Sequence, residues 1–224
     1  MEINTINWGL IPYGEAYAQQ KRMFDQAIQQ KTDKKKVTNH LIFCEHPHVI
    51  TLGKNASSAN LLLPEKSLQE KQIEVVQTDR GGDITYHGPG QIVVYPIFDL
   101  EQFGIGLKEY IYRLEEVIIR TINHYGITGE RMNGATGVWI DPKIPHRTRK
   151  IAAIGVRCSR YVTMHGFALN VNTDLSYFRT INPCGFTDKG VTSLQAELGR
   201  LVDMDEVREL VLREAFYLST KPAV

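Results

Sequence analysis

The sequence predicts an α+β fold: a mixed, mostly antiparallel sheet with helices packed on it. Three long stretches carry apolar residues at helical spacing, and short runs rich in Val, Ile and aromatic residues lie between them. The order is helix, several strands, helix, several strands, helix, which differs from the regular alternation of a doubly wound sheet. No linker-like segment interrupts the chain, so we expect residues 1–224 to form a single domain.

The three helices are expected at residues 13–30, at 107–125 and near the end of the chain. The second has an apolar residue at every third or fourth position, and Gly126 follows it as a stop signal. The last should begin at Asp203, which with Glu206 resembles a capping box ahead of an apolar stripe.

The strands are expected in the short β-branched and aromatic runs, which are separated by Gly, Pro, Asn and Asp. These runs are 40–45, 48–52, 73–78, 92–100, 137–140, 151–157 and 166–172.

Composition and charge exclude several classes of protein. Hydrophobic residues make up 42% of the chain and charged residues 23%, values typical of a globular protein rather than a disordered or fibrous one. The net charge of +1 gives no long-range attraction to nucleic acid, so we expect no nucleic-acid partner. The first residues lack the pattern of a signal peptide, and no apolar run is long enough to cross a bilayer. We therefore expect a soluble, cytoplasmic protein without a membrane partner.

The cysteines are three, Cys44, Cys158 and Cys184, and none forms a CxxC pair. An odd number in a reducing compartment argues against a disulfide framework, and the spacing argues against structural zinc. Cys44 lies in an apolar strand, as a buried structural cysteine does. Cys184 lies in a Pro-Cys-Gly turn, which favours a presented, reactive thiol with backbone N–H groups nearby to lower its pKa. Cys158, at the end of a strand, is the rival candidate.

A glycine-rich segment, residues 80–91, lies between two predicted strands and holds Arg80, Asp83 and His87. Glycines allow the backbone to approach a ligand closely, but the same pattern also fits a hairpin turn, and the segment alone does not decide. It contains neither the P-loop nor the dinucleotide-binding fingerprint. His87 is the histidine best placed for a site, with His165 next. No HExxH spacing occurs, so we expect no metal and no cofactor.

Several segments, in this order, resemble the lipoyl(octanoyl) transferase family, the octanoyltransferases of lipoate biosynthesis. They are HLIFCEHPHVITLGKNA, RGGDITYHGPGQIVVYPIFDL, KIAAIGVR, HGFALNVN and the closing NPCG…VTSL, and together they cover roughly residues 13 to 200. The resemblance implies the catalytic-domain fold shared with biotin protein ligases and lipoate ligases. It also implies an acyltransferase that moves an octanoyl group from octanoyl-acyl carrier protein to a lysine of lipoyl domains. The acceptors would be the lipoyl domains of 2-oxoacid dehydrogenases and the glycine cleavage H protein.

The same resemblance implies the site residues. Cys184 matches the nucleophile that forms a thioester acyl-enzyme, and Lys150 matches the lysine that lowers the pKa of that thiol. Read without the resemblance, Lys150 is an ordinary surface lysine. The substrate pocket would be lined by Arg80, Gly81, Gly82, Asp83, Ile84, Thr85, Tyr86, His87, Ala153, Ile154, Gly155, Gly166, Phe167 and Ala168.

This chemistry is coherent in its own right. A thiolate that attacks a thioester exchanges one thioester for another without ATP, and the amide formed next is more stable than the thioester. A desolvated lysine has a lowered pKa and can pass protons on, while amides of the glycine-rich loop could stabilise the oxyanion. At about 0.8 kcal/mol per buried CH₂, an eight-carbon tail calls for an apolar tunnel.

Two other functions remain open at this point. An ATP-dependent lipoate or biotin ligase on the same fold would need no cysteine; Cys184 and the absence of a ligase-type GRGRxG loop count against it. A non-catalytic module that binds acylated carrier proteins would need neither Cys184 nor Lys150. The segment 141–149 looks longer and more basic than the family pattern. We expect the basic loop 143–150, with Arg147 and Arg149 as the residues to test, to attract an acidic carrier protein.

Overall fold

The computed structural model describes residues 2–182 and 189–219 and contains two sheets. The large sheet has the strand order β1-β2-β6-β10-β9-β8-β7, and β11 pairs with β9 outside this path. The pairs β1–β2 and β11–β9 are parallel and the others are antiparallel. The small sheet has the order β4-β3-β5, with β3 parallel to β4 and antiparallel to β5. The sheet is therefore mixed and mostly antiparallel, as predicted.

The strands of the large sheet are β1 (Ile3–Leu10), β2 (Asn39–Glu45), β6 (Gln91–Ile97), β7 (Glu130–Met132), β8 (Ala135–Ile140), β9 (Arg149–Ser159), β10 (Val162–Asn170) and β11 (Gly190–Val191). Those of the small sheet are β3 (Val49–Leu52), β4 (Glu74–Gln77) and β5 (Ile84–His87). The helices are α1 (Tyr13–Thr32), α2 (Glu65–Glu70), α3 (Leu100–Phe103), α4 (Leu107–Asn123), α5 (Leu194–Leu198) and α6 (Met204–Ala215), with short 3₁₀ turns η1 (Ser58–Asn60), η2 (Leu175–Thr180) and η4 (Phe216–Ser219).

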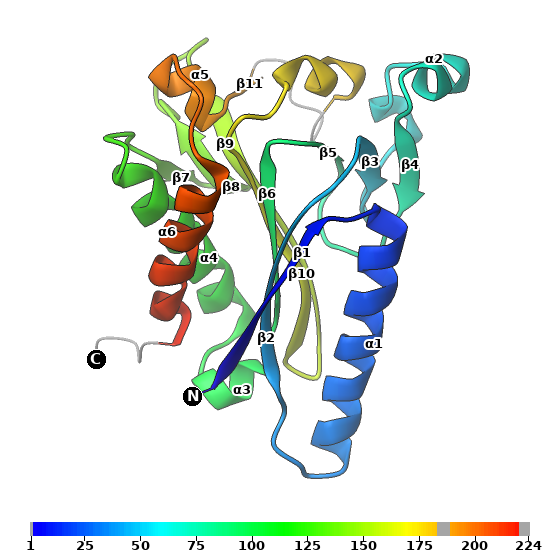
Figure 1. The fold of residues 1–224 in the computed structure, drawn as a ribbon, viewed down its shortest axis with the longest axis vertical. Helices are drawn as coiled ribbons and strands as arrows, with labels where there is room; N and C mark the ends of the chain where they lie inside the picture. The colour runs from blue at the N-terminus through cyan, green and yellow to red at the C-terminus, as the bar shows by residue number, and fades with distance from the viewer. Residues whose placement is uncertain (1, 183–188, 220–224) are drawn as a thin grey trace.

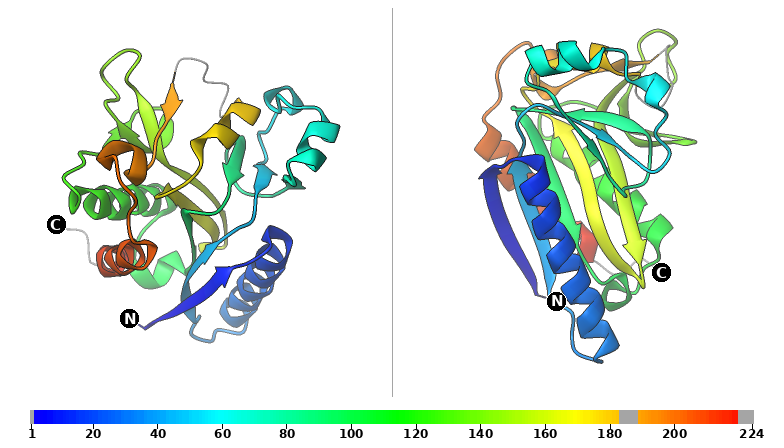
Figure 2. Two further views of the ribbon diagram at one scale, coloured as in Figure 1. Left: turned by 45° about the horizontal axis from the view of Figure 1, so that its top comes forward. Right: turned by 90° about the vertical axis from the view of Figure 1, so that its right-hand side faces the viewer.

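Helices cover both faces of the large sheet (Figure 1). Helix α1 packs across one face, on strands β6 and β10, and its inward residues Ala16, Phe24 and Ala27 join alternate side chains of these strands in one apolar core. Helices α4 and α6 pack together on the opposite face, over a larger core. Because strand side chains alternate between the two faces, neighbouring residues such as Val93 and Val94 serve different cores. Figure 2 shows the small sheet beside the N-terminal end of α1, next to the upper end of the large sheet.

The three predicted helices are confirmed, and Asp203 caps α6 by accepting from the amides of Asp205 and Glu206. The predicted strands at 48–52 and 73–78 form, but they belong to the small sheet rather than to the large one. Strand β1 was not predicted. It is an edge strand with only scattered apolar residues, so it gives a weak alternating signal. Within the described ranges, no helix is long and apolar enough to cross a membrane.

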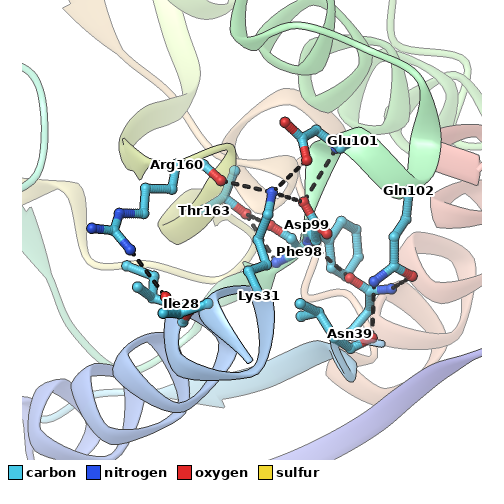
Figure 3. A network of polar contacts seen from close by, with 11 residues as sticks. Ile28, Lys31, Asn39, Phe98, Asp99, Glu101, Gln102, Arg160 and Thr163 are labelled. Carbon is cyan, nitrogen blue, oxygen red and sulfur yellow. Dashed lines mark hydrogen bonds and ion pairs between the residues drawn. The ribbon is translucent and has the colours of Figure 1, made fainter. Parts of the chain in front are cut away.

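The C-terminal end of α1 is tied to the rest of the fold by a polar network (Figure 3). The Lys31 ammonium donates to Asp99 Oδ1 at 2.6 Å and to the Arg160 carbonyl at 2.8 Å, and pairs with Glu101 at 2.9 Å. Asp99 caps α3, and its own amide donates to Asn39 Oδ1 at 2.9 Å. This cluster connects the last turn of α1, the start of α3 and the β9–β10 hairpin.

Candidate active site

A cavity of about 350 Å³ lies between the large sheet and the glycine-rich segment that leads into β5. Strands β6, β9 and β10 form its floor, and residues of the 80–87 segment cover it. Its lining changes along its length. Lys150 and Thr136 border it where the chain is half-buried or exposed, whereas Tyr13, Tyr95 and His165 border it where the chain is buried. The cavity thus has an outer end at Lys150 and an inner end beneath α1.

The floor of the cavity is built from small residues on two paired strands. Ala153 lies opposite Ala168, and Gly155 lies opposite Gly166 in the β9–β10 register. A Cβ at Gly155 would lie 2.8 Å from the Gly81 carbonyl oxygen, so only glycine lets the 80–82 loop approach the sheet this closely. The Gly81 amide then donates to the Val156 carbonyl at 2.9 Å. Ala153, Ile154, Phe167 and Ala168 give this part of the cavity an apolar lining.

Most of the predicted substrate residues border this one cavity. They are Arg80, Gly82, Asp83, Ile84, Thr85, His87, Ala153, Ile154, Gly155, Gly166, Phe167 and Ala168. Gly81 and Tyr86 do not border it. The Gly81 amide is bound to Val156, which removes it as an oxyanion donor, and the Tyr86 ring packs against Tyr177 in the core of the small sheet.

Lys150 lies at the start of β9, and its side chain extends over the β8 strand. Its Nζ donates to the Thr136 carbonyl at 3.1 Å and lies 4.5 Å from the centre of the Trp139 ring. Gly137 makes room for it: a Cβ there, at a φ of +125°, would lie 3.3 Å from Lys150 Cε. The Thr136 carbonyl and the Trp139 ring together hold the Lys150 amine at the cavity.

Cys184 lies outside the described residues, and the described residues that flank it in the chain are Asn182 and Lys189. On the near side, Asn182 donates its amide to the Asn60 carbonyl at 2.8 Å. On the far side, β11 pairs with β9 so that Gly190 lies opposite Arg149 and Val191 lies opposite Lys150. The described chain after Cys184 therefore resumes with a strand directly beside Lys150.

The two described cysteines are poor nucleophiles. Burial raises the pKa of the Cys44 thiol, and the nearby Glu45 carboxylate raises it further. Burial also raises the pKa of Cys158, which lies near the β9–β10 hairpin, outside the cavity lining. Since the thiolate is the reacting form, neither thiol is activated.

The inner end of the cavity is lined by buried aromatic and imidazole rings. Desolvation lowers the pKa of His87 to about 3 and that of His46 to about 4, so both rings are neutral at physiological pH. His46 Nδ1 donates to the Ile11 carbonyl at 2.8 Å, so its Nε2 accepts from the Tyr95 hydroxyl at 2.7 Å. The Tyr13 ring stacks on His87 with a centroid distance of 6.0 Å.

An ionic cluster adjoins this inner end. His165 Nε2 donates to Asp79 Oδ1 at 2.8 Å, and Arg157 pairs with the other carboxylate oxygen. The hydrogen bond from His165 is the main cause that holds the pKa of Asp79 at about 2, and Arg157 contributes. Burial lowers the pKa of His165 against the opposing effect of Asp79. The cluster fixes Asp79, the residue that precedes the glycine-rich segment, to β9 and β10.

The basic segment before Lys150 is largely neutralised within the molecule. Arg149 forms a two-pronged pair with Glu197, with both N–O distances 2.6 Å, and also donates to Asp141 at 2.7 Å. Arg147 pairs with Asp141 at 3.0 Å, and Lys143 pairs with Glu130 at 2.7 Å. Arg149 thus joins β9 to α5, and its charge is not directed at solvent.

Several residues that border the cavity were not predicted. They are Tyr13, Gln91, Val93, Tyr95, Gly134, Ala135, Thr136, His165, Asn170, Phe178 and Val191, although His165 was noted as a second candidate among the histidines. Tyr13 opens a helix and Tyr95 lies in an apolar strand, so both look like ordinary core residues in the sequence. Thr136 and Val191 reach the cavity through strand pairing that the sequence does not reveal.

Comparison with known proteins agrees with this architecture. Residues 16–216 match the model of the lipoyl protein ligase A/B catalytic domain. An octanoyltransferase from Bacteroides fragilis is 56% identical over 214 residues, which is 96% of each chain. One from Parabacteroides distasonis is 56% identical over 208 residues, which is 93% of this chain and 94% of that one.

Solved structures share the fold at low sequence identity. A lipoate protein ligase from Thermoplasma acidophilum superimposes with a TM-score of 0.71 and 16% identity, over 97% of this chain and 84% of that one. Biotin protein ligase from Aquifex aeolicus superimposes with a TM-score of 0.51 and 13% identity, over 97% of this chain and 69% of that one. The predicted fold relationship to lipoate and biotin ligases is confirmed, and the chain belongs to the octanoyltransferases of the lipoyl protein ligase A/B catalytic-domain family.

Proposed function

We propose that the chain transfers an octanoyl group from octanoyl-acyl carrier protein to a lysine of a lipoyl domain through a thioester on Cys184. The observation that carries this proposal is the position of Lys150, at the outer end of an apolar cavity and beside the strand that follows Cys184. The proposal treats residues 1–224 as one catalytic domain in the cytoplasm.

In the first half-reaction, the Cys184 thiolate attacks the carbonyl carbon of the donor thioester. The carrier thiolate leaves and takes up a proton from the Lys150 ammonium, which becomes a neutral amine, and the octanoyl group becomes bound to Cys184. A free thiol has a pKa of about 8.5, so at neutral pH it needs a nearby positive charge to be ionised. The Lys150 ammonium supplies that charge, since the Thr136 carbonyl and the Trp139 ring hold it at the cavity.

In the second half-reaction, the acceptor lysine amine attacks the acyl-Cys184 carbonyl. An amide forms, the Cys184 thiolate leaves, and the proton lost by the attacking amine passes to Lys150 or to Cys184. This direction is downhill because an amide is more stable than a thioester, so no ATP is needed. Lys150 fits the role of proton carrier better than an arginine would, because a lysine can lose its proton.

The acyl tail would lie on the floor of small residues between β9 and β10. Ala153, Gly155 and Ala168 leave the space that a hydrocarbon chain fills, and Phe167 borders it. Burying the methylene groups contributes about 0.8 kcal/mol each, so an octanoyl chain gains several kcal/mol over an acetyl group. This supports a medium-chain acyl group as the substrate.

The acceptors we propose are the lipoyl domains of 2-oxoacid dehydrogenases and the glycine cleavage H protein. Support comes from the octanoyltransferase relatives and, at the level of fold, from an archaeal lipoate protein ligase whose structure was described with its E2 lipoyl domain. Charge reversal at Lys143 or Arg147, which are exposed, tests attraction of an acidic donor more cleanly than Arg149, whose pair with Glu197 is internal.

Transfer assays with single cysteine variants test the proposal. Cys184→Ser should abolish transfer from octanoyl-acyl carrier protein to a lipoyl domain, whereas the matched control Cys158→Ser should keep it. Full transfer by Cys184→Ser would contradict the proposed nucleophile.

An ATP-dependent ligase is the second candidate, because lipoate-protein ligase A bound with ATP has the same fold with a TM-score of 0.70 at 16% identity. Such an enzyme would activate free octanoate as an acyl-adenylate and would not depend on Cys184. Octanoylation of a lipoyl domain from octanoate and ATP, retained in Cys184→Ser, would favour this reading over the thioester route.

A further inference from the structure

One buried polar atom at the inner end of the cavity lacks a hydrogen-bond partner, and a tyrosine hydroxyl there makes no hydrogen bond within the described residues. His165 is 2% exposed, and its Nδ1 has no partner in the part of the chain that the structure describes. Tyr13 is also 2% exposed, and over residues 2–182 and 189–219 its hydroxyl makes no hydrogen bond. Both residues border the cavity. Since buried polar groups are nearly always satisfied, His165 Nδ1 marks a place where a polar group belongs, and the Tyr13 hydroxyl is available at the same cavity.

The chemical character of the two atoms is set by their neighbours. His165 Nε2 carries its proton toward the ionised Asp79 carboxylate, so Nδ1 of the neutral ring is an acceptor. Burial raises the pKa of Tyr13, so its hydroxyl stays protonated and is a donor. Both side chains stack on the Tyr17 ring, with centroid distances of 6.2 Å for Tyr13 and 5.7 Å for His165, so they belong to one group of rings at this end of the cavity. A donor and an acceptor together suit a hydroxyl group, which accepts one hydrogen bond and donates another.

The plain methyl end of an octanoyl chain cannot satisfy either atom. With such a chain bound, the pair depends on a water molecule or stays unsatisfied, which costs free energy in a buried site. A chain that carries a hydroxyl at its far end would accept from Tyr13 and donate to His165 Nδ1. The outer end, at Lys150, is set apart from this pair along β9, so only a hydroxyl remote from the carbonyl could reach it.

We propose that the inner end of the cavity is a hydroxyl-binding subsite, formed by Tyr13 and His165, that admits medium-chain acyl groups hydroxylated at the ω carbon. This rests on the proposed function, in which the acyl carbonyl lies at the Lys150 end. The acceptable substrates then include ω-hydroxyoctanoyl as well as octanoyl thioesters, and Tyr13 sets the preference between them.

The test compares kcat/KM for ω-hydroxyoctanoyl and octanoyl thioesters in the full-length enzyme. In Tyr13→Phe the ring and its stacking remain but the hydrogen-bond donor is lost. The kcat/KM for the ω-hydroxyoctanoyl thioester, divided by that for the octanoyl thioester, should therefore fall roughly three- to tenfold. Tyr110→Phe is the matched control, because the Tyr110 side chain is also buried but belongs to the core under α4 and does not border the cavity. Its ratio should equal that of the wild type.

A second substrate separates a local effect from general damage. β-Hydroxyoctanoyl carries its hydroxyl near the carbonyl, so its ratio to octanoyl should not change in Tyr13→Phe. An unchanged ω-hydroxyoctanoyl ratio in Tyr13→Phe, or an equal fall for both hydroxylated substrates, would overturn the subsite.

A binding measurement separates this proposal from the proposed function. If the wild type fails to transfer octanoyl from a thioester, the proposed function has failed. Calorimetry then still tests the subsite, by measuring the affinities of free ω-hydroxyoctanoate and octanoate for the wild type and for Tyr13→Phe. The subsite proposal fails if the ratio of the two affinities is the same in both proteins.

Discussion

The two ends of helix α1 carry polar clusters of opposite character. At the C-terminal end, Lys31, Asp99 and Asn39 find hydrogen-bond or ion-pair partners within the protein (Figure 3). At the N-terminal end, Tyr13 and, on the facing strand, His165 present a donor and an acceptor that no described group satisfies. The first end borders solvent and loops, and the second borders the cavity.

This contrast separates structural polar groups from groups kept for a ligand. A satisfied cluster contributes to the stability and the unique packing of the fold, so its removal should weaken folding. An unsatisfied cluster destabilises the fold and persists where another molecule completes it. Substitutions in the cluster at the C-terminal end of α1 should therefore lower the stability of the fold, whereas substitutions at the cavity should lower catalytic activity.

The largest effect is expected from Lys150→Met at the outer end of the cavity. Loss of the ammonium removes both thiolate stabilisation and proton transfer, so kcat/KM for octanoyl transfer should fall by roughly 10²- to 10⁴-fold. Lys150→Arg keeps the charge but cannot release a proton at neutral pH, and it should also be strongly impaired. A Lys150→Met enzyme within tenfold of the wild type would contradict the role of this lysine.

The matched substitution at the other cluster is Lys31→Met. It leaves the Asp99 carboxylate, which is 7% exposed, without its ammonium partner, and should lower the free energy of unfolding by about 1–3 kcal/mol. Octanoyl kcat/KM should stay within twofold, because Lys31 is remote from the cavity lining. Urea denaturation and the transfer assay measure the two quantities. A variant that loses activity without losing stability would erase the distinction between the clusters.

A smaller effect is expected from Asp79→Asn, which tests the ionic cluster beside the inner end. The folded-state pKa of Asp79, about 2, lies below the value of about 3.9 for an unfolded aspartate. The carboxylate therefore stabilises the fold above about pH 4, and this contribution is lost as the pH falls towards 2. The difference in urea midpoint between wild type and variant should be constant from pH 5 to 7 and shrink below about pH 4. A difference that grows on acidification would have the wrong sign.

The sequence predicted the helices and most strands because their apolar periodicity is strong, as in α4. The sequence did not predict features that depend on which strands pair with each other rather than on apolar periodicity. The runs at 48–52 and 73–78 read as strands, but nothing in them indicates that they pair with each other and form a separate sheet. Strand β1 was missed because an edge strand needs few apolar residues.

The site shows the same division. The glycine-rich segment is conspicuous in the sequence, and most of it borders the cavity. Lys150 was assigned only through family resemblance, because its environment comes from β8 and β11, distant in sequence. The sequence does not reveal that Tyr13 borders the cavity, because a tyrosine in the first turn of an amphipathic helix looks like a core residue. Its position at a cavity depends on how α1 crosses the sheet.

Intact-mass spectrometry after brief incubation with octanoyl-acyl carrier protein, without acceptor, tests the central claim most directly. The account predicts that the wild type and Cys158→Ser each gain the mass of one octanoyl group, which hydroxylamine removes, and that Cys184→Ser gains no hydroxylamine-sensitive adduct. A thioester adduct that persists in Cys184→Ser, or a wild type that transfers octanoyl without ever carrying one, would contradict it.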